Sequence, residues 1–348
     1  MIQRKKKRTA NIGFFSVAHE TYFGQFDGLE EKLRIYHAET VKILAKNDVN
    51  VIDYGIVASN AEAFGAAGKM NADGLDLLFC NMITYATSSV FAPIIKNVGV
   101  PVVLTALQPL RRLDYTKAST FMQLENDNIC SVPEFTGVAI RMGKKVADVV
   151  IGCLYGDDEA ERNIAEWCDV AKVLHSLKGA RIGLMGHVLE AMYDMHADPT
   201  AISEAFGVHV PLIEIDDAVK CYEEVTDGEI EAKKKIILEE FDTPNPESDP
   251  VTEKLTEADL ERAARGAAAL DRLVAEKRLT GLAYYYEGRE GTIQRETSTS
   301  FIVGNSILNA EGTPMCGEFD IKTCIAMLIM DRLGIGGSFA EFHPFDFD

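Results

Sequence analysis

The fold is decided by residues 12–54, which read IGFFSVAHETYFGQFDGLEEKLRIYHAETVKILAKNDVNVIDY. This stretch opens with the apolar run Ile12–Ala18 and closes with a second, Val49–Tyr54, each short enough to be a buried strand. Between them, residues of one face recur at helical spacing from Leu29 to Leu44, after Asp27 as a candidate N-cap. A strand, a helix and a strand in this order are typical of a parallel sheet.

The same alternation continues along the chain. Further strands are predicted at Leu75–Cys80, Pro101–Leu107, Val149–Tyr155, Ala180–Gly186, Val210–Asp216 and Thr280–Glu287. Helices are predicted at about 157–177, 199–207, 217–241, 252–279 and 321–333. We therefore expect an α/β protein with two doubly wound, Rossmann-like parallel-sheet domains, at residues 1–178 and 179–333.

Composition narrows the class of protein. The net charge is −19, from 54 acidic and 35 basic residues, which disfavours a nucleic-acid partner. No window approaches the roughly 20 apolar residues of a membrane span. The seven cysteines include no Cys-x-x-Cys pair, as expected for free thiols in the reducing cytoplasm. The basic run Arg4–Arg8 is expected to be a solvated leader, with an interaction tail as the alternative.

Several catalytic signatures are missing from the sequence. It contains no Gly-x-Gly-x-x-Gly after the first strand, no phosphate-binding Gly-x4-Gly-Lys-Ser/Thr loop, no His-Glu-x-x-His and no Gly-x-Ser-x-Gly. Nucleotide-dependent hydride transfer, phosphoryl transfer and serine hydrolysis therefore lack their usual motifs.

Polar residues follow the predicted strands, where ligands bind in doubly wound folds. They are uncharged hydrogen-bonding or aromatic groups and one carboxylate: His19, Tyr22, Asn81, Thr84, Tyr85, Gln108, His187 and Glu287. This mixture favours a polyhydroxylated ligand over a phosphate. The structural alternatives are helix caps for Asn and Thr, packing for the tyrosines, and a structural role for His187.

Glu287 and Glu318 are the strongest candidates for a catalytic or metal-binding role, because each is an acid close to an apolar run. Glu287 ends the run Leu282–Tyr286, and Glu318 follows Met315–Gly317. A carboxylate in such a place costs free energy unless it is paired or binds a cation. The structural alternative for Glu318 is an acid at a helix N-terminus, stabilised by the helix dipole. The local pattern leaves a catalytic or metal role and a structural role open.

Several segments resemble the L-arabinose isomerase family. In the first half of the chain they are His19–Gly24, Leu104–Gln108, Phe121–Asn126 and Pro133–Met142. The strongest is Gly317–Thr323 (GEFDIKT), which is similar to the family's Gly-Glu-x-Asp-x-Lys-Thr signature, and Gly336–Phe339 follows at the family's expected place. The similarity is spread over nearly all of the chain.

The resemblance implies an aldose–ketose isomerase that uses Mn²⁺, with Mg²⁺ or Co²⁺ as alternatives. In the family, two glutamates and two histidines hold the metal; Glu287 and Glu318 fall on the glutamate positions, and His343 lies near one histidine position. The other histidine belongs to a C-terminal β-rich domain, so residues 334–348 are expected to be the start of a domain that is otherwise absent. The resemblance also implies a homo-oligomer in which N-terminal loops complete a neighbour's site.

The implied chemistry is proton transfer within an open-chain sugar. The metal would act as a Lewis acid and stabilise an enediolate, while Glu287 and Glu318 move a proton between C2 and C1. The sugar hydroxyls would be contacted by four strand-end residues: His19, Tyr85, Gln108 and His187. The alternative is a non-catalytic, cytoplasmic sugar-binding or regulatory protein on the same fold. The sequence does not name the sugar.

Overall fold

The computed structural model describes residues 2–243, 245–248, 252–342 and 344–347, which form two compact units. The N-terminal unit comprises residues 8–175, and the C-terminal unit comprises the described residues of 1–7 and 176–348. Each unit is built on an all-parallel sheet with helices between the strands, which confirms the predicted doubly wound α/β class. Within the described ranges, no helix is both long enough and apolar enough to cross a membrane.

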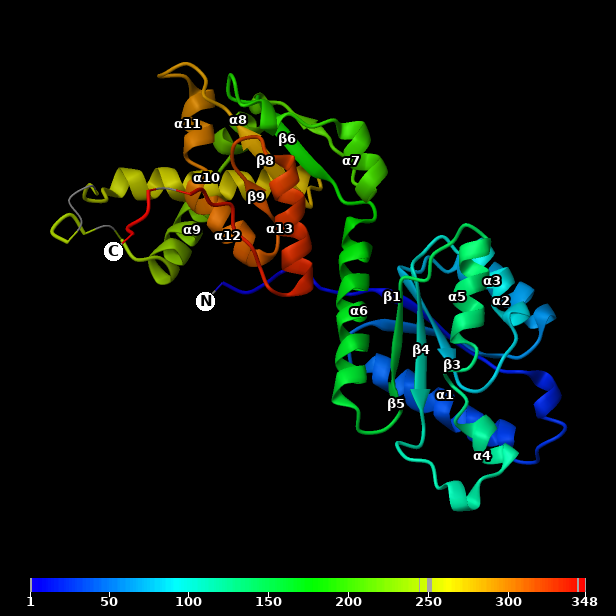
Figure 1. The fold of residues 1–348 in the computed structure, drawn as a ribbon. Helices are drawn as coiled ribbons and strands as arrows, with labels where there is room; N and C mark the ends of the chain where they lie inside the picture. Colours follow the sequence, from blue (N-terminus) through cyan, green and yellow to red (C-terminus); the bar gives the residue numbers. More distant parts are fainter. Residues whose placement is uncertain (1, 244, 249–251, 343, 348) are drawn as a thin grey trace. The chain divides into compact units, whose positions relative to one another are not determined.

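The N-terminal unit contains a five-stranded sheet in the order β2-β1-β3-β4-β5 (Figure 1). Its strands are β1 (Asn11–Val17), β2 (Asn50–Val57), β3 (Leu77–Met82), β4 (Val102–Gln108) and β5 (Asp148–Cys153). Its helices are α1 (Leu29–Ala45), α2 (Asn60–Ala72), α3 (Ala92–Asn97), α4 (Thr120–Glu125), α5 (Val132–Arg141) and α6 (Asp158–Leu177).

Helices cover both faces of this sheet, because successive strand residues point to opposite sides. Phe14 and Phe79 pack with residues of α1 and α6, whereas Phe15 and Cys80 pack with residues of α2, α3 and α5. The three central strands, β1, β3 and β4, are buried, as expected for the run Ile12–Ala18. The run Val49–Tyr54 was also expected to be a buried strand, but it lies in β2, which, like β5, carries exposed and half-buried residues because it lies at an edge of the sheet.

A rung of polar side chains crosses the middle of the sheet beneath α1. Ser16, Asn81 and Thr105 are paired in register on β1, β3 and β4, and all three are buried. The Asn81 amide donates to Ser16 Oγ at 3.1 Å and accepts from Thr105 Oγ1 at 3.0 Å. His37 of α1 lies 2.8 Å from Ser16 Oγ through Nδ1 and 2.9 Å from Asp53 Oδ1 through Nε2. We call these five residues the polar rung.

The C-terminal unit contains a four-stranded sheet in the order β7-β6-β8-β9. Its strands are β6 (Ile182–Gly186), β7 (Leu212–Ile213), β8 (Gly281–Tyr285) and β9 (Met315–Cys316). Its helices are α7 (Pro199–Phe206), α8 (Ile215–Glu223), α9 (Asp227–Glu240), α10 (Glu257–Glu276), α11 (Ile293–Thr299), α12 (Ile302–Glu311) and α13 (Ile321–Leu333). Residues of α8, α9, α10 and α12 share one core with β6 and β8, and α13 packs against β6, β8 and β9.

Three local predictions are wrong. The strand expected at Val210–Asp216 is only Leu212–Ile213, and α8 begins at Ile215. The single helix expected at 217–241 is two helices, because Thr226 and Glu229 form a capping box that starts α9. Asp27 is not an N-cap; Gly28 occupies that position before α1.

The basic N-terminal segment is largely exposed, as expected of a solvated leader, but it is also docked on the C-terminal unit by specific contacts. Ile2 packs against the core of the C-terminal unit, and Arg4 forms an ion pair with Asp331. The main-chain nitrogen of Lys5 donates to the Glu311 carbonyl at 3.0 Å, and its ammonium group lies 2.7 Å from the Glu311 carboxylate. These contacts tie the start of the chain to α12 and α13.

Candidate functional site

Three of the predicted site residues lie at one edge of the C-terminal sheet. His187 follows β6, Glu287 lies two residues after β8, and Glu318 lies two residues after β9. The strands are parallel neighbours, with Gly186 paired to Tyr285 and Ala283 paired to Cys316. Because parallel strands end at the same edge of a sheet, their loops form a common site.

His187 is fixed in position by the neighbouring strand. Its main-chain nitrogen donates to the Tyr285 carbonyl at 3.0 Å, and its exposed ring lies edge-on to the Tyr285 ring at 5.5 Å. The residue before it is Gly186, whose φ is 92°. A Cβ atom there would lie 1.9 Å from the Tyr285 carbonyl oxygen, so only glycine permits this approach.

Glu318 occupies a strained turn between β9 and α13. Glu318 and Phe319 have φ angles of 55° and 61°, in the left-handed region that residues other than glycine seldom adopt. Glu318 Oε2 is buried and has no hydrogen-bond partner among the described residues. Desolvation, together with the negative charge of Glu341, raises the pKa of Glu318. Strain and an unpartnered acid at one residue are typical of functional sites.

Glu287, in the loop after β8, is exposed to solvent. The pKa of the Tyr285 hydroxyl is raised by desolvation and then by the charges of both Glu287 and Glu318. The two carboxylates therefore act on the same hydroxyl group. Their joint negative charge at one sheet edge would favour a cation or a ligand that donates hydrogen bonds.

A pocket of about 420 Å³ lies beside Glu318. Its walls come from β8, α11, α12, the Glu318 turn and the following C-terminal segment: Tyr284, Tyr285, Tyr286, Ser298, Thr299, Ile302, Asn305, Ser306, Asn309, Met315, Gly317, Glu318, Ser338 and Phe339. Phe339 closes against Gly317, where an added Cβ atom would lie 3.0 Å from the ring. We call this cavity the Glu318 pocket.

Sequence reasoning missed two polar residues of this pocket, Tyr284 and Asn305. The Asn305 side-chain nitrogen donates to the Tyr284 hydroxyl at 2.8 Å, and Asn305 Oδ1 is buried without a partner among the described residues. Burial raises the pKa of Tyr284 to about 12, so the hydroxyl stays protonated. Asn305 lies inside α12, away from any strand end, and only the apolar run containing Tyr284 was visible in the sequence.

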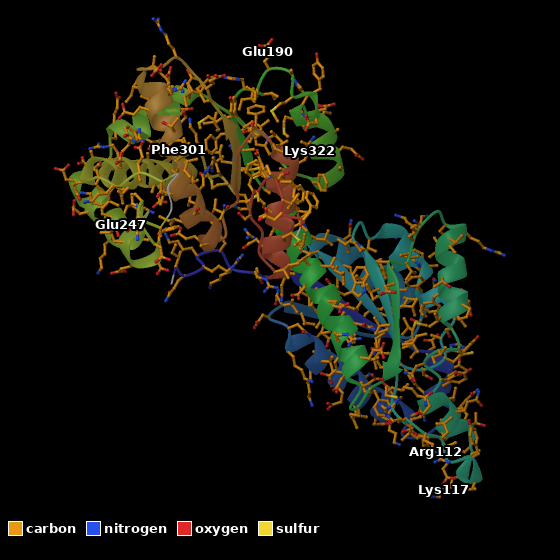
Figure 2. The ribbon with its side chains drawn as sticks, turned by 60° about the vertical axis from the view of Figure 1, so that its left-hand side comes forward. Arg112, Lys117, Glu190, Glu247, Phe301 and Lys322 are labelled. Atoms are coloured by element: carbon orange, nitrogen blue, oxygen red, sulfur yellow. The ribbon has the colours of Figure 1, made fainter. Side chains whose placement is uncertain are left out.

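The rest of the Gly317–Thr323 motif has structural roles. Asp320 caps α13 by accepting from the main-chain nitrogens of Lys322 and Thr323 at 3.0 and 3.1 Å. The Thr323 hydroxyl donates to the same carboxylate at 2.6 Å. Lys322 lies at the start of α13 (Figure 2), and its ammonium group donates to the Asp194 carbonyl. The motif therefore holds the turn that presents Glu318.

Three other predicted site residues, His19, Tyr85 and Gln108, lie in the N-terminal unit. The His19 ring contacts Tyr22 edge-on at 5.1 Å, and Tyr22 lies 6.3 Å from Tyr85, so one aromatic cluster contains His19 and Tyr85. Gln108 ends β4, and its side-chain amide donates to the Leu110 carbonyl. The predicted ligand His343 lies outside the described residues. Among the residues described, no group of three or more His, Cys, Asp or Glu side chains is placed to hold a metal ion.

Comparison with known proteins gives one distant relative among curated sequences. The chain is 26% identical over 218 residues to an L-arabinose isomerase from Nocardioides sp. (strain ATCC BAA-499 / JS614), covering 61% of this chain and 41% of that protein. The matched region thus spans less than half the length of the relative. No family model matches the chain.

Among solved structures, one match is a ligand-free, open substrate-binding protein with adhesive properties from Clostridium difficile. It is 12% identical, and the alignment covers 96% of this chain and 100% of that one. The TM-score is 0.21, at which the likeness carries no argument.

Proposed function

We propose that the chain is a metal-dependent aldose–ketose isomerase whose reaction takes place in the Glu318 pocket. The observation that carries the proposal is the buried Oε2 atom of Glu318, which has no partner among the described residues. It adjoins a pocket lined by hydroxyl and amide groups, which suit the hydroxyls of a sugar. The distant similarity to an L-arabinose isomerase supports the same reaction class.

The donor groups of this site fit a divalent cation with oxygen ligands. Glu287 and Glu318 would hold the ion, and Mn²⁺, Mg²⁺ and Co²⁺ all accept carboxylate ligands. A cation there would give Glu318 Oε2 the partner that it lacks, and it would offset the repulsion from Glu341. When bound, the ion would polarise the sugar carbonyl as a Lewis acid.

The two glutamates would move the proton. One carboxylate would take the proton from C2 of the open-chain aldose, which leaves an enediolate with its negative charge on O1. The other carboxyl group, in its protonated form, would give a proton to C1 while the proton of the O2 hydroxyl passes to O1, so that the carbonyl forms at C2.

The reaction is tested by an isomerase assay on aldopentoses and aldohexoses, with Mn²⁺ and with EDTA. We expect ketose formation that EDTA removes and that both Glu287→Gln and Glu318→Gln abolish. Glu290→Gln is the matched control, because Glu290 is an exposed acid of the same loop but, unlike Glu287, is not among the charges that raise the pKa of the Tyr285 hydroxyl. Sugar that binds without turnover in the wild-type protein would instead identify a non-catalytic sugar-binding protein.

The proposal extends to the N-terminal unit, where His19, Tyr85 and Gln108 would contact the sugar of a neighbouring copy in a homo-oligomer. Mixing subunits tests this arrangement. His19→Ala and Glu318→Gln should each inactivate the protein alone. Co-expression of the two variants should restore activity at those sites that combine His19 from the Glu318→Gln variant with Glu318 from the His19→Ala variant. Inactive mixed oligomers would exclude the shared site.

A further inference from the structure

Asn305 is a pocket residue whose hydrogen bonds are incomplete among the described residues. It projects from α12, and its amide contacts the Tyr284 hydroxyl at 2.8 Å. The remaining polar atom, Oδ1, is buried and has no partner among the described residues. Exchanging the amide oxygen and nitrogen changes which atom faces Tyr284, but either orientation leaves one buried polar atom without a partner.

A neighbouring asparagine shows what a structural role looks like here. Asn309 lies one turn further along α12, and its Oδ1 accepts from the Met315 main-chain nitrogen at 2.7 Å. That bond ties α12 to β9. Asn305 instead bonds to a side chain of β8, the Tyr284 hydroxyl, and its Oδ1 has no partner among the described residues. It shares the Glu318 pocket with a second unpartnered oxygen, Glu318 Oε2.

The lining of the pocket restricts what could supply the missing bonds. No Lys or Arg belongs to the lining in the part of the chain that the structure describes, whereas it includes one carboxylate, two asparagines, three serines, a threonine and three tyrosines. An anionic ligand would meet the Glu318 carboxylate without a compensating cation. A neutral ligand with several hydroxyl groups can donate to both unpartnered oxygens and can also accept hydrogen bonds.

We propose that Asn305 is a specificity-determining residue, held by Tyr284, that hydrogen-bonds one hydroxyl of a neutral polyol or sugar bound in the Glu318 pocket. The inference rests on the proposed function only in placing the reacting carbons at Glu318. The hydroxyl that Asn305 binds is then one of those away from C1 and C2. A site built to bind a hydroxyl rejects ligands that lack it or that present it in the wrong configuration.

Binding is measured by calorimetry with the full chain in EDTA, using free aldopentoses and the corresponding pentitols. Pentitols have no carbonyl group and cannot isomerise, so this measurement does not depend on turnover. We expect Asn305→Leu to lower the affinity for the tightest-binding ligand by roughly 3- to 10-fold, which is the contribution of one uncharged hydrogen bond. Ser203→Ala, at an exposed residue of α7 that does not line the pocket, should change the affinity by less than about 2-fold and is the control.

A second measurement distinguishes direct contact from a general loss of packing. Monodeoxy analogues of the best ligand are titrated against wild type and Asn305→Leu. Loss of the contacted hydroxyl should weaken wild-type binding but leave binding to the variant unchanged, because the two changes remove the same bond. Tyr284→Phe should give an intermediate loss, since it removes the group that orients the amide. Asn305→Ala replaces the leucine variant if circular dichroism shows that the latter is unfolded.

The outcomes separate this inference from the proposed function. Unchanged affinity in Asn305→Leu would overturn the inference even if the protein is an isomerase. Failure of every pentose and pentitol to bind the wild-type protein would also overturn it. Pentitol binding that depends on Asn305, in a protein that turns over no sugar with Mn²⁺, would support the inference while the proposed isomerase activity fails.

Discussion

The polar rung of the N-terminal unit and the Glu318 pocket of the C-terminal unit both remove polar atoms from water, but they differ in partners. In the rung, the side chains of Ser16, Asn81 and Thr105 all find hydrogen-bond partners within the unit. In the pocket, Glu318 and Asn305 each keep one buried oxygen without a partner among the described residues. Buried polar groups whose hydrogen bonds are complete indicate a role in stability, whereas buried groups without partners indicate a binding site for a ligand or an ion.

The largest expected effect is on the rung. Asn81→Leu keeps the side-chain volume but removes the acceptor of Thr105 and a donor to Ser16. We expect the N-terminal unit to lose about 3 kcal/mol of unfolding free energy, because buried polar groups are left unpartnered. The fluorescence of Trp167, the single tryptophan and a residue of this unit, follows its unfolding in urea. A loss below about 1 kcal/mol would mean that the rung is not structural.

A substitution in the Glu318 pocket should change the unfolding free energy in the opposite direction. Glu318→Gln removes an ionised, poorly solvated carboxylate, so we expect the metal-free C-terminal unit to gain roughly 1 kcal/mol of stability while turnover is lost. Urea unfolding in EDTA at pH 7, followed by far-ultraviolet circular dichroism, measures the change. Destabilisation by Glu318→Gln would show that the carboxylate supports the fold, and the contrast with the rung would fail.

Glu229 provides a further test, because it is an acid whose carboxylate has hydrogen-bond partners, unlike Glu318. Arg272 and then Thr226 lower its pKa to about 2 from 4.5. Because the folded-state pKa lies below the unfolded one, its stabilisation is complete above pH 4.5 and is lost as the pH falls toward 2. Allowing for solvent screening, Glu229→Gln should cost about 1 kcal/mol at pH 7. Unfolding curves of both proteins should converge near pH 2; a constant difference would contradict the assignment.

The smallest expected effect is a second Asn-to-Leu change, matched to Asn81→Leu. Asn305→Leu removes an unpartnered oxygen but also removes the partner of Tyr284, so the two effects oppose each other. We expect a net change within about 0.5 kcal/mol in urea unfolding without ligand. A loss as large as that of Asn81→Leu would place Asn305 among the structural residues.

Much of the fold could be predicted from apolar periodicity. Runs such as Ile12–Ala18 are long enough to identify a strand, and the parallel arrangement follows from the helices between them. β9 contains only two residues, Met315 and Cys316, so no periodicity could show it. The capping-box residues Thr226 and Glu229 indicate that 217–241 is divided into two helices. The apolar pattern continues across this point and therefore predicts a single helix.

The site was predictable only where it lies at strand ends. His187 and Glu287 come directly after apolar runs, and the carboxyl edge of a parallel sheet brings such residues together. Asn305 has no comparable signal, because it faces the pocket only once α12 packs beside β8. The strain at Glu318 is likewise invisible in the sequence, because it depends on how the turn joins β9 to α13.

The docked N-terminal segment makes the C-terminal unit discontinuous along the chain, since the N-terminal unit is inserted between residue 7 and residue 176. During synthesis, Arg4 and Lys5 leave the ribosome long before their partners Asp331 and Glu311 exist. The inserted unit has all of its strands available early and can fold first. The C-terminal unit must close a loop of more than 300 residues to complete itself. Its contacts from Arg4 and Lys5 therefore form only after Asp331 and Glu311 have been made, later than the strands of the inserted unit.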